Sequence, residues 1–350
     1  MKPAAPAAEP AIPRLDQLTS LRFFAALAVL SSHLWMLAES PDILRPLGQT
    51  VFHEGYAGVS FFFMLSGFIL NYTYRRKLLQ GAISKTRYLV LRVIRIYPLH
   101  AITALPFAAY ALLNGGLGEL PKAIANLALA QSWIPLPDFY FSLNEPSWSL
   151  SDELFFYAAF AWLAFLPARR LALGASALFA IAALTACALM IHGHASWRID
   201  GKFGFPHWLS YINPATRLLD FLVGMLIYRC PRPRLSRRLW TAGEALALLA
   251  LLAAMYAFSR LQLPEVLRGQ LLYLPFMALV IYVFAQGVGA VSEGLRDWRL
   301  VRLGDASFAL YMIHLPILNG AYLLFERLGE PLPLVPTPPA WPAYASAFRC

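Results

Sequence analysis

Long apolar runs separated by short loops dominate this chain and restrict the folds open to it. A hydrocarbon core about 30 Å thick requires roughly 20 apolar residues in a helix. Lipid offers the backbone no hydrogen-bond partners, so only helices or closed barrels can cross it. The sequence therefore predicts an all-α, polytopic transmembrane helical bundle with about nine spans, near 18–38, 56–74, 93–113, 146–166, 171–191, 211–229, 240–260, 268–287 and 303–327.

The composition agrees with a membrane protein. Of the 350 residues, 59% are hydrophobic and only 14% are charged, whereas soluble proteins carry about 25% charged residues. The net charge of +10 comes from basic residues in short loops. Membrane topology explains such loops, so we expect no nucleic-acid partner. Cys187, Cys230 and Cys350 lack the paired spacing of a zinc site or disulfide framework, and no metal is expected.

The distribution of arginine and lysine predicts the orientation of the bundle. The loops after the second and sixth spans are rich in arginine, whereas the loops after the first and third carry only Arg45 and Lys122. Basic loops remain in the cytoplasm, because positive residues resist translocation. The N-terminus is therefore predicted to be cytoplasmic.

The two ends of the chain differ from the middle. Residues 1–17 are rich in proline and alanine, which predicts a disordered cytoplasmic tail. Residues 18–327 form the predicted membrane domain, and residues 328–350 form a Pro-rich C-terminal tail. The last residues are too few for a tenth helix, so we expect the chain to be shortened at this end.

Two polar residues in the first span indicate chemistry. Arg22 and His33 stand eleven positions apart, which places them on one helix face, about 16 Å apart along the axis. Ionisable groups at membrane depth are costly unless they line a cavity or find partners. A lone membrane histidine often serves only to bond a neighbouring helix. Imidazole can also take a proton from an attacking hydroxyl, so His33 is the candidate general base.

The segment NEPSWSLSDELFFY introduces two acids at the start of the fourth span. Ser149 and Glu153 are four residues apart and share a helix face. A carboxylate at the depth of His33 would orient the imidazole and stabilise its protonated form. The alternative is a serine N-cap followed by first-turn acids, which suits Asp152 better than Glu153.

Arginines in RYLVLRVIRIYP stand close to the predicted third span. Arg92 and Arg95 are one helical turn apart, and arginine binds phosphates through paired hydrogen bonds. The alternative is ordinary anchoring of a basic segment at the cytoplasmic surface.

Two further groups of polar residues lie within predicted spans. Ser307, Tyr311 and His314 form a polar stripe on the ninth span that could face the same cavity. Arg217 and Asp220, three residues apart in the sixth span, are interpreted as a structural ion pair. The chain carries no GxSxG, GxxxxGK, HExxH or CxxC motif, which disfavours ATP hydrolysis and zinc chemistry.

Five stretches, taken together, resemble the membrane acyltransferase family 3, whose members modify bacterial surface and secreted carbohydrates. The resemblance covers about residues 15–327 and follows the family's order of motifs. The stretches are SLRFFAALAVLSSHLW, SFFFMLSGFIL, RYLVLRVIRIYPLH, PSWSLSDELFFY and SFALYMIHLPI. Such proteins usually have a tenth span, which this chain lacks.

The resemblance implies roles for residues that its motifs contain. The family's histidine, regarded as essential for acyl transfer, matches His33. Its Arg-x-x-Arg pair, linked to the CoA donor, matches Arg92 and Arg95. The WSLS-x-E motif supports Glu153 as the second catalytic residue. The predicted substrate-binding residues are Trp148, Ser149, Ser151, Tyr311 and His314.

The expected reaction is transfer of an acyl group, acetyl above all, from acyl-CoA to a sugar hydroxyl, in the bacterial inner membrane. Acyl-CoA (acetyl-CoA) serves as co-substrate, held by Arg22, Arg92 and Arg95. The acceptor is a carbohydrate or a lipid-linked sugar, in contact with membrane lipid. His33 acts as base or as acyl carrier, and the sequence leaves both routes open. It also leaves open the oligomeric state and two alternatives, a proton-coupled transporter and an inactive polytopic scaffold.

Overall fold

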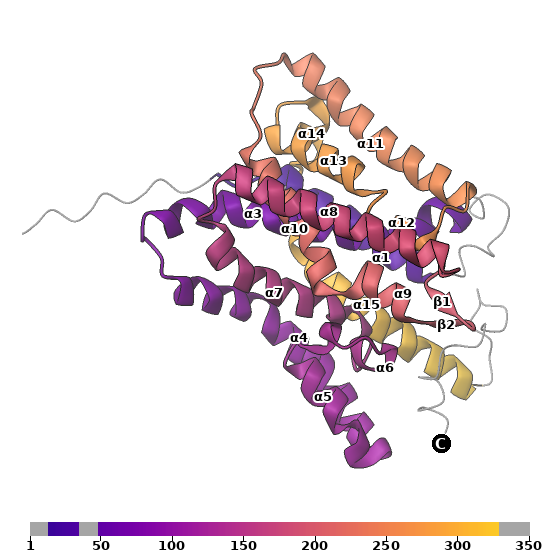
Figure 1. The fold of residues 1–350 in the computed structure, drawn as a ribbon. Helices are drawn as coiled ribbons and strands as arrows, with labels where there is room; N and C mark the ends of the chain where they lie inside the picture. Colours follow the sequence, from indigo (N-terminus) through magenta and orange to yellow (C-terminus); the bar gives the residue numbers. More distant parts are fainter. Residues whose placement is uncertain (1–12, 35–47, 329–350) are drawn as a thin grey trace, which may run out of the picture.

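The computed structural model describes residues 13–34 and 48–328, and these are almost entirely helical (Figure 1). Most of both predicted tails and the end of the predicted span 18–38 lie outside the described residues. The long helices are α1 (Asp16–His33), α3 (Gly58–Leu79), α4 (Lys85–Gly115), α7 (Trp148–Leu163), α8 (Ala168–Ile191), α10 (Pro214–Arg229), α11 (Arg237–Arg260), α13 (Leu274–Gln286) and α15 (Trp298–Leu328).

Shorter elements connect the long helices. The short α-helices are α5 (Leu120–Leu127), α6 (Pro137–Tyr140), α9 (Phe205–His207), α12 (Glu265–Arg268) and α14 (Ala290–Gly294). Single 3-10 turns cover His53–Ala57, Gly116–Glu119, Gln131–Trp133 and Glu145–Ser147, and π-turns cover Gly48–Phe52 and Trp208–Ile212. The strands β1 (Arg198–Ile199) and β2 (Lys202–Phe203) form an antiparallel hairpin that pairs Arg198 with Phe203.

The all-α prediction is confirmed, and each predicted span overlaps one of the long helices. Among the described residues, four helical segments are long and apolar enough to cross a membrane by length and composition, and α13 is a shorter apolar helix. The count of nine spans stays a prediction. The four segments are Gly48–Leu79, Lys85–Leu127, Ala168–Ile191 and Arg237–Arg260.

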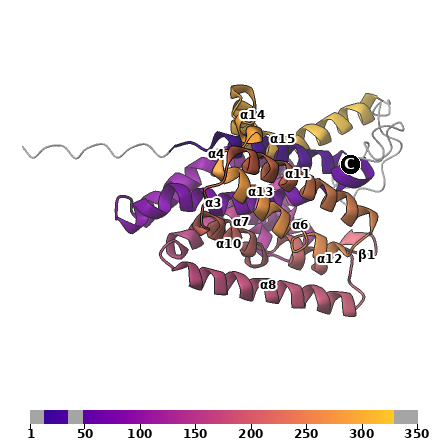
Figure 2. The same cartoon turned by 90° about the horizontal axis from the view of Figure 1, so that it is seen from above.

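Burial separates the helices that face lipid from those that enclose the interior. The most apolar stretches of α8 and α11 are only 11% and 22% buried, whereas that of the α3 segment is 72% buried. Figure 2 shows α8 along one edge of the bundle. An apolar helix that packs little protein around itself is suited to contact with lipid. Polar side chains gather instead on α1, α7, α10 and α15, where neighbouring helices cover them.

Close contact between α3 and α10 forms the centre of the bundle. A Cβ added at Gly224 would lie 1.8 Å from the Met64 carbonyl oxygen, and one added at Gly67 would lie 2.1 Å from the Phe221 carbonyl oxygen. Glycine at both positions therefore lets the two backbones touch, as small residues do between membrane helices.

Helix α4 begins earlier than the predicted span. Ser84 caps its N-terminus by accepting a hydrogen bond from the Arg87 backbone N–H at 3.1 Å. The helix then continues through Pro98 and Pro106 to Gly115. Arg92 and Arg95 consequently lie inside the helix rather than before it, so they project from a rigid element toward its neighbours.

Candidate active site

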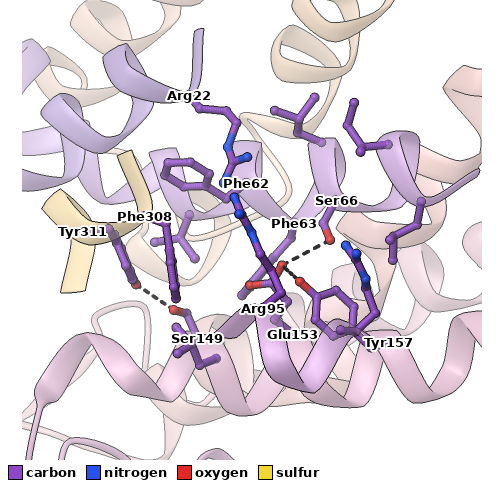
Figure 3. Close-up of a pocket in the computed structure, with 16 residues that line it drawn as sticks. Arg22, Phe62, Phe63, Ser66, Arg95, Ser149, Glu153, Tyr157, Phe308 and Tyr311 are labelled. Carbon is purple, nitrogen blue, oxygen red and sulfur yellow. Dashed lines mark hydrogen bonds between the residues drawn. The ribbon is translucent and has the colours of Figure 1, made fainter. Parts of the chain in front are cut away.

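A cavity of about 130 Å³ lies where five helices meet (Figure 3). α1, α3, α4, α7 and α15 each contribute side chains to it, and apolar residues form most of its wall. The structure brings six of the predicted site residues together at this cavity, from segments far apart in the sequence: Arg22, Arg92, Arg95, Ser149, Glu153 and Tyr311.

Among the residues that line the cavity, one is acidic, and it is Glu153. Its Oε1 accepts hydrogen bonds from Tyr157 Oη at 2.5 Å and from Ser66 Oγ at 3.3 Å. Neither Tyr157 nor Ser66 was among the predicted site residues. Tyr157 follows Glu153 by four residues on one helix face, which was a usable signal. Ser66 belongs to α3, and no local pattern connects it with Glu153.

The arginines give the cavity an excess of positive charge. Arg22 and Arg95 point toward each other in Figure 3, and neither forms a hydrogen bond or close ion pair with another described residue. Arg92 donates to Tyr74 Oη at 2.7 Å and lies over its ring. Three arginines face one carboxylate, a formal charge of +2, so the cavity is suited to an anion.

A second cavity, of about 270 Å³, adjoins the first. The two share Arg22, Leu65 and Ile69 as lining residues. The second cavity extends along α1 to Arg14, which pairs with Asp305. The two cavities therefore lie next to each other between the N-terminal end of α1 and Glu153.

His33 lies apart from this cavity, at the last residue of α1. Its Nδ1 lies 2.8 Å from the Val29 carbonyl oxygen of the same helix, and its ring contacts that of His314 edge-on, with 5.0 Å between centroids. The expected orienting contact from Glu153 is not formed, because Glu153 lines the cavity, where it bonds to Tyr157 and Ser66, and His33 does not line it. Within the described residues, the ring partner of His33 is His314.

Tyr311 connects the histidine pair with the cavity. Its hydroxyl lies 2.8 Å from Ser149 Oγ, and both residues line the cavity (Figure 3). His314 is one turn further along α15, where its Nδ1 lies 2.6 Å from the Tyr311 carbonyl oxygen. Tyr311 therefore lines the cavity, as predicted for the polar stripe on the ninth span. His314, from the same stripe, contacts His33 instead.

Other predicted residues lie in packed surroundings away from the cavity. Trp148 packs against the rings of Phe63 and Tyr211. Ser151 is buried, donates to the Leu129 carbonyl oxygen at 2.7 Å and accepts from Ser132 at 2.7 Å. These contacts give Trp148 and Ser151 structural rather than substrate-facing positions. Ser307 likewise bonds its own helix, at the Gly304 carbonyl oxygen.

The ion pair expected between Arg217 and Asp220 is confirmed. Arg217 Nη1 lies 3.3 Å from Asp220 Oδ2, and both side chains are fully buried. Arg217 also donates to Ser60 Oγ at 3.0 Å and to the Gly269 carbonyl oxygen at 3.1 Å. The pair therefore joins α3, α10 and the segment before α13. Across residues 13–34 and 48–328, no cluster of three His, Cys, Asp or Glu side chains could hold a metal ion.

Comparison with known proteins shows the same kinship along nearly the whole chain. A family model described as an acyltransferase domain, Acyl_transf_3, matches residues 15–348. The acyltransferase MdmB of Streptomyces mycarofaciens is 32% identical over 337 residues, which cover 91% of this chain and 83% of that protein.

Two rhizobial proteins are also similar. The exopolysaccharide production protein ExoZ of Rhizobium meliloti (strain 1021) is 28% identical, over 75% of this chain and 76% of that protein. Nodulation protein 10 of Rhizobium leguminosarum bv. viciae is 25% identical, over 85% of this chain and 82% of its own. No solved structure matches the chain significantly.

Proposed function

The chain belongs to acyltransferase family 3, and from this premise we propose that it transfers an acyl group, acetyl in the first instance, from acyl-CoA to a sugar hydroxyl. The observation that carries the proposal is the cavity in which three arginines and one carboxylate meet inside an apolar bundle. Arg22 and Arg92 are partly buried and Arg95 is exposed, so their guanidinium groups can reach a charged ligand that enters the cavity. Arginines in excess over carboxylates attract anions, so an anionic co-substrate is the proposed occupant.

Acyl-CoA has the chemistry that this cavity requires. Its phosphates are anionic and its pantetheine arm is long and largely uncharged, which matches arginines in a cavity with apolar walls. Arg22 lines both cavities and stands at their junction, with Arg92 and Arg95 on the opposite helix. We assign these three residues to the phosphates, because guanidinium groups donate paired hydrogen bonds to them. The thioester then extends from the arginines toward His33.

His33 is proposed as the group that handles the proton or the acyl group. Its Nδ1 faces the Val29 carbonyl oxygen, which can only accept, so Nδ1 carries the hydrogen of the neutral ring and Nε2 keeps a lone pair. In the direct route Nε2 takes the hydroxyl proton as the oxygen–carbon bond forms. The carbon–sulfur bond then breaks, and the proton passes to the departing thiolate. In the carrier route Nε2 attacks the thioester carbon, the carbon–sulfur bond breaks and CoA leaves as its thiolate. The acceptor hydroxyl then attacks the acyl carbon, the nitrogen–carbon bond breaks, and the hydroxyl proton passes to the thiolate.

Glu153 takes a different role from the one predicted. It is bonded to Tyr157 and Ser66. Its carboxylate offsets part of the arginine charge and forms part of the cavity wall next to the bound donor. Ser149 and Tyr311, at the same cavity, are proposed to contact the acyl end of the donor or the acceptor. Hydroxyl groups at such a position orient a substrate by hydrogen bonding.

We propose the orientation in the membrane from the distribution of basic residues, and the class of acceptor from the similar proteins. Basic loops favour a cytoplasmic N-terminus, so the Arg14 end of the second cavity would face cytoplasmic acyl-CoA in the bacterial inner membrane. His33, at the other end of α1, would meet the acceptor toward the outer face. Kinship with an exopolysaccharide production protein favours a polysaccharide precursor or lipid-linked sugar.

Transfer from labelled acetyl-CoA tests this proposal. The protein is incorporated into nanodiscs and into inverted membrane vesicles, and acetyl-CoA binding, thiol release and label in the glycolipid and polysaccharide fractions are measured. We expect saturable binding and transfer, with transfer lost in His33→Ala and binding weakened in Arg95→Gln. A protein that binds no acetyl-CoA, or a His33→Ala variant with wild-type transfer, would overturn the proposal. Acyl-CoA-independent solute uptake would instead favour a transporter.

A further inference from the structure

We propose that His314 is the positioning residue for His33, the role that sequence reasoning gave to Glu153. The inference rests on the proposed function, because it assumes that His33 is the reacting group. Its basis is the contact between the two imidazole rings, which join α1 to α15 with 5.0 Å between centroids and a 60° angle between planes.

The hydrogen bonds of the two rings determine which nitrogens are free. His33 Nδ1 faces the Val29 carbonyl oxygen at 2.8 Å, and His314 Nδ1 faces the Tyr311 carbonyl oxygen at 2.6 Å. A carbonyl oxygen only accepts, so each Nδ1 donates and each neutral ring keeps its lone pair on Nε2. Both rings are thereby locked in one tautomer by the backbone of their own helices.

His314 Nε2 is buried and has no hydrogen-bond partner among the described residues. The side chain is 3% exposed, and an unsatisfied buried acceptor costs free energy that folding must offset elsewhere. Other buried polar atoms of the bundle also lack partners, among them His100 Nδ1, so the contact between the His33 and His314 rings is the observation that assigns a role to His314. Because the two rings are in contact, we assign the Nε2 lone pair of His314 to His33, where it would stabilise the imidazolium that forms when His33 takes the hydroxyl proton.

The same helix turn connects this pair to the cavity. Tyr311 provides the carbonyl that fixes His314, and its own hydroxyl is bonded to Ser149. Ser149 and Glu153 both line the cavity from α7. A donor molecule that displaces the Tyr311 hydroxyl would shift the turn of α15 whose carbonyl oxygen orients His314. The donor site is thus physically connected to His33 through Tyr311 and His314.

The test separates positioning from binding and from folding. In nanodiscs, kcat and the KM for acetyl-CoA are measured for His314→Leu, His314→Gln and His314→Gly. We expect kcat of His314→Leu to fall about 100-fold, at the lower end of what general-base catalysis contributes, with the KM for acetyl-CoA nearly unchanged. His314→Gln keeps a polar acceptor and should recover part of kcat. Added imidazole should raise kcat of His314→Gly and not of His314→Leu.

His100→Gln provides a matched control. His100 is also fully buried and lies 3.1 Å from a backbone carbonyl oxygen, that of Asn126, but it does not line the cavity. It reports the folding cost of losing a buried histidine and should leave kcat per folded molecule unchanged.

Several results would overturn the inference. The first is a His314→Leu variant with the kcat of the wild-type protein. The second is an equal loss of kcat in all three variants with no recovery on adding imidazole. The third is a change in the KM for acetyl-CoA with no change in kcat. The proposed function fails separately, when the wild-type protein itself transfers no acetyl group.

Discussion

Arg22 of α1 and Arg95 of α4 point toward each other across one small cavity, and the Glu153 carboxylate shares that cavity with them (Figure 3). Two guanidinium groups that face each other repel each other, and the partial burial of Arg22 reduces the screening by solvent. An anionic ligand between them removes that repulsion. Binding of such a ligand should therefore stabilise the folded protein.

Neutralising one of the two arginines should weaken donor binding. We expect Arg95→Gln to raise the KM for acetyl-CoA about 10-fold or more, because a hydrogen bond to a charged group contributes about 1.5–3 kcal/mol. Acetyl-CoA should raise the midpoint of thermal unfolding of the wild-type protein and raise that of Arg95→Gln less. Arg87→Gln is the control, since Arg87 lies on the same helix but does not line the cavity. An equal effect of both substitutions on KM would reduce the role of Arg95 to general surface charge.

Removing the carboxylate should affect binding and turnover in opposite directions. Glu153→Gln raises the formal charge of the cavity from +2 to +3, counted over the three arginines and one glutamate that line it. We therefore expect a lower KM for acetyl-CoA together with a lower kcat, because a tightly held anionic product is released slowly. Steady-state kinetics and the release rate of CoA check this. A raised KM would show that Glu153 binds substrate directly.

Tyr157→Phe should distinguish the position of Glu153 from its charge. The substitution removes one of the two hydrogen bonds to Glu153 Oε1 and retains the aromatic ring. Loss of a bond to a charged group costs about 1.5–3 kcal/mol, so the unfolding midpoint and kcat should both fall. Ser66→Ala, which removes the longer bond, should have the smaller effect. The reverse order would show that Ser66 is the partner that positions the carboxylate.

Enlarging a glycine at the crossing of α3 and α10 should destabilise the bundle. A side chain at Gly224 meets the Met64 carbonyl oxygen at 1.8 Å, and backbone cannot move aside as a flexible side chain can. Gly224→Ala should therefore cost about 1–3 kcal/mol or more and lower the unfolding midpoint in detergent. Gly174→Ala on α8 is the control, because its nearest neighbouring atom lies 3.9 Å away. Equal midpoints for the two variants would contradict the close packing described.

Acid should destabilise the aromatic cluster around His207. The ring stacks on Phe203 at 4.3 Å, contacts Trp197 at 5.0 Å, and its Nδ1 lies 3.2 Å from Tyr140 Oη. Burial, and secondly the nearby Arg198 cation, lower the pKa of His207 to about 3. The unfolded residue has a pKa near 6.5, so the unfolded state binds a proton that the folded state does not. The free energy of unfolding is thus fully retained above about pH 6.5 and decreases as the pH falls toward 3.

At pH 5 the loss from His207 should amount to about 2 kcal/mol. The measurement is thermal unfolding of the wild-type protein and His207→Phe between pH 8 and pH 5. The phenylalanine ring cannot be protonated, so its unfolding midpoint should fall less on acidification. Parallel pH dependence in the two proteins would show that other groups account for the loss.

Much of the bundle could be predicted from the sequence, because helix length and polarity are local properties. Apolar runs placed every long helix, and helical periodicity put Ser149 and Glu153 on one face of α7. The Arg217–Asp220 pair was predictable for the same reason, since its partners are three residues apart in one helix. Errors arose where a residue's partner belongs to another helix.

The sequence by itself determined an all-helical membrane protein of acyltransferase family 3, with arginines, an acid and a histidine on its inner helix faces. Only the tertiary structure decided which of these meet. Glu153 is bonded to Tyr157 and Ser66, and His33 is paired with His314. Periodicity specifies a face within one helix. The rotation and offset between helices depend on close packing, as at Gly67 and Gly224, and no single segment of sequence carries that information.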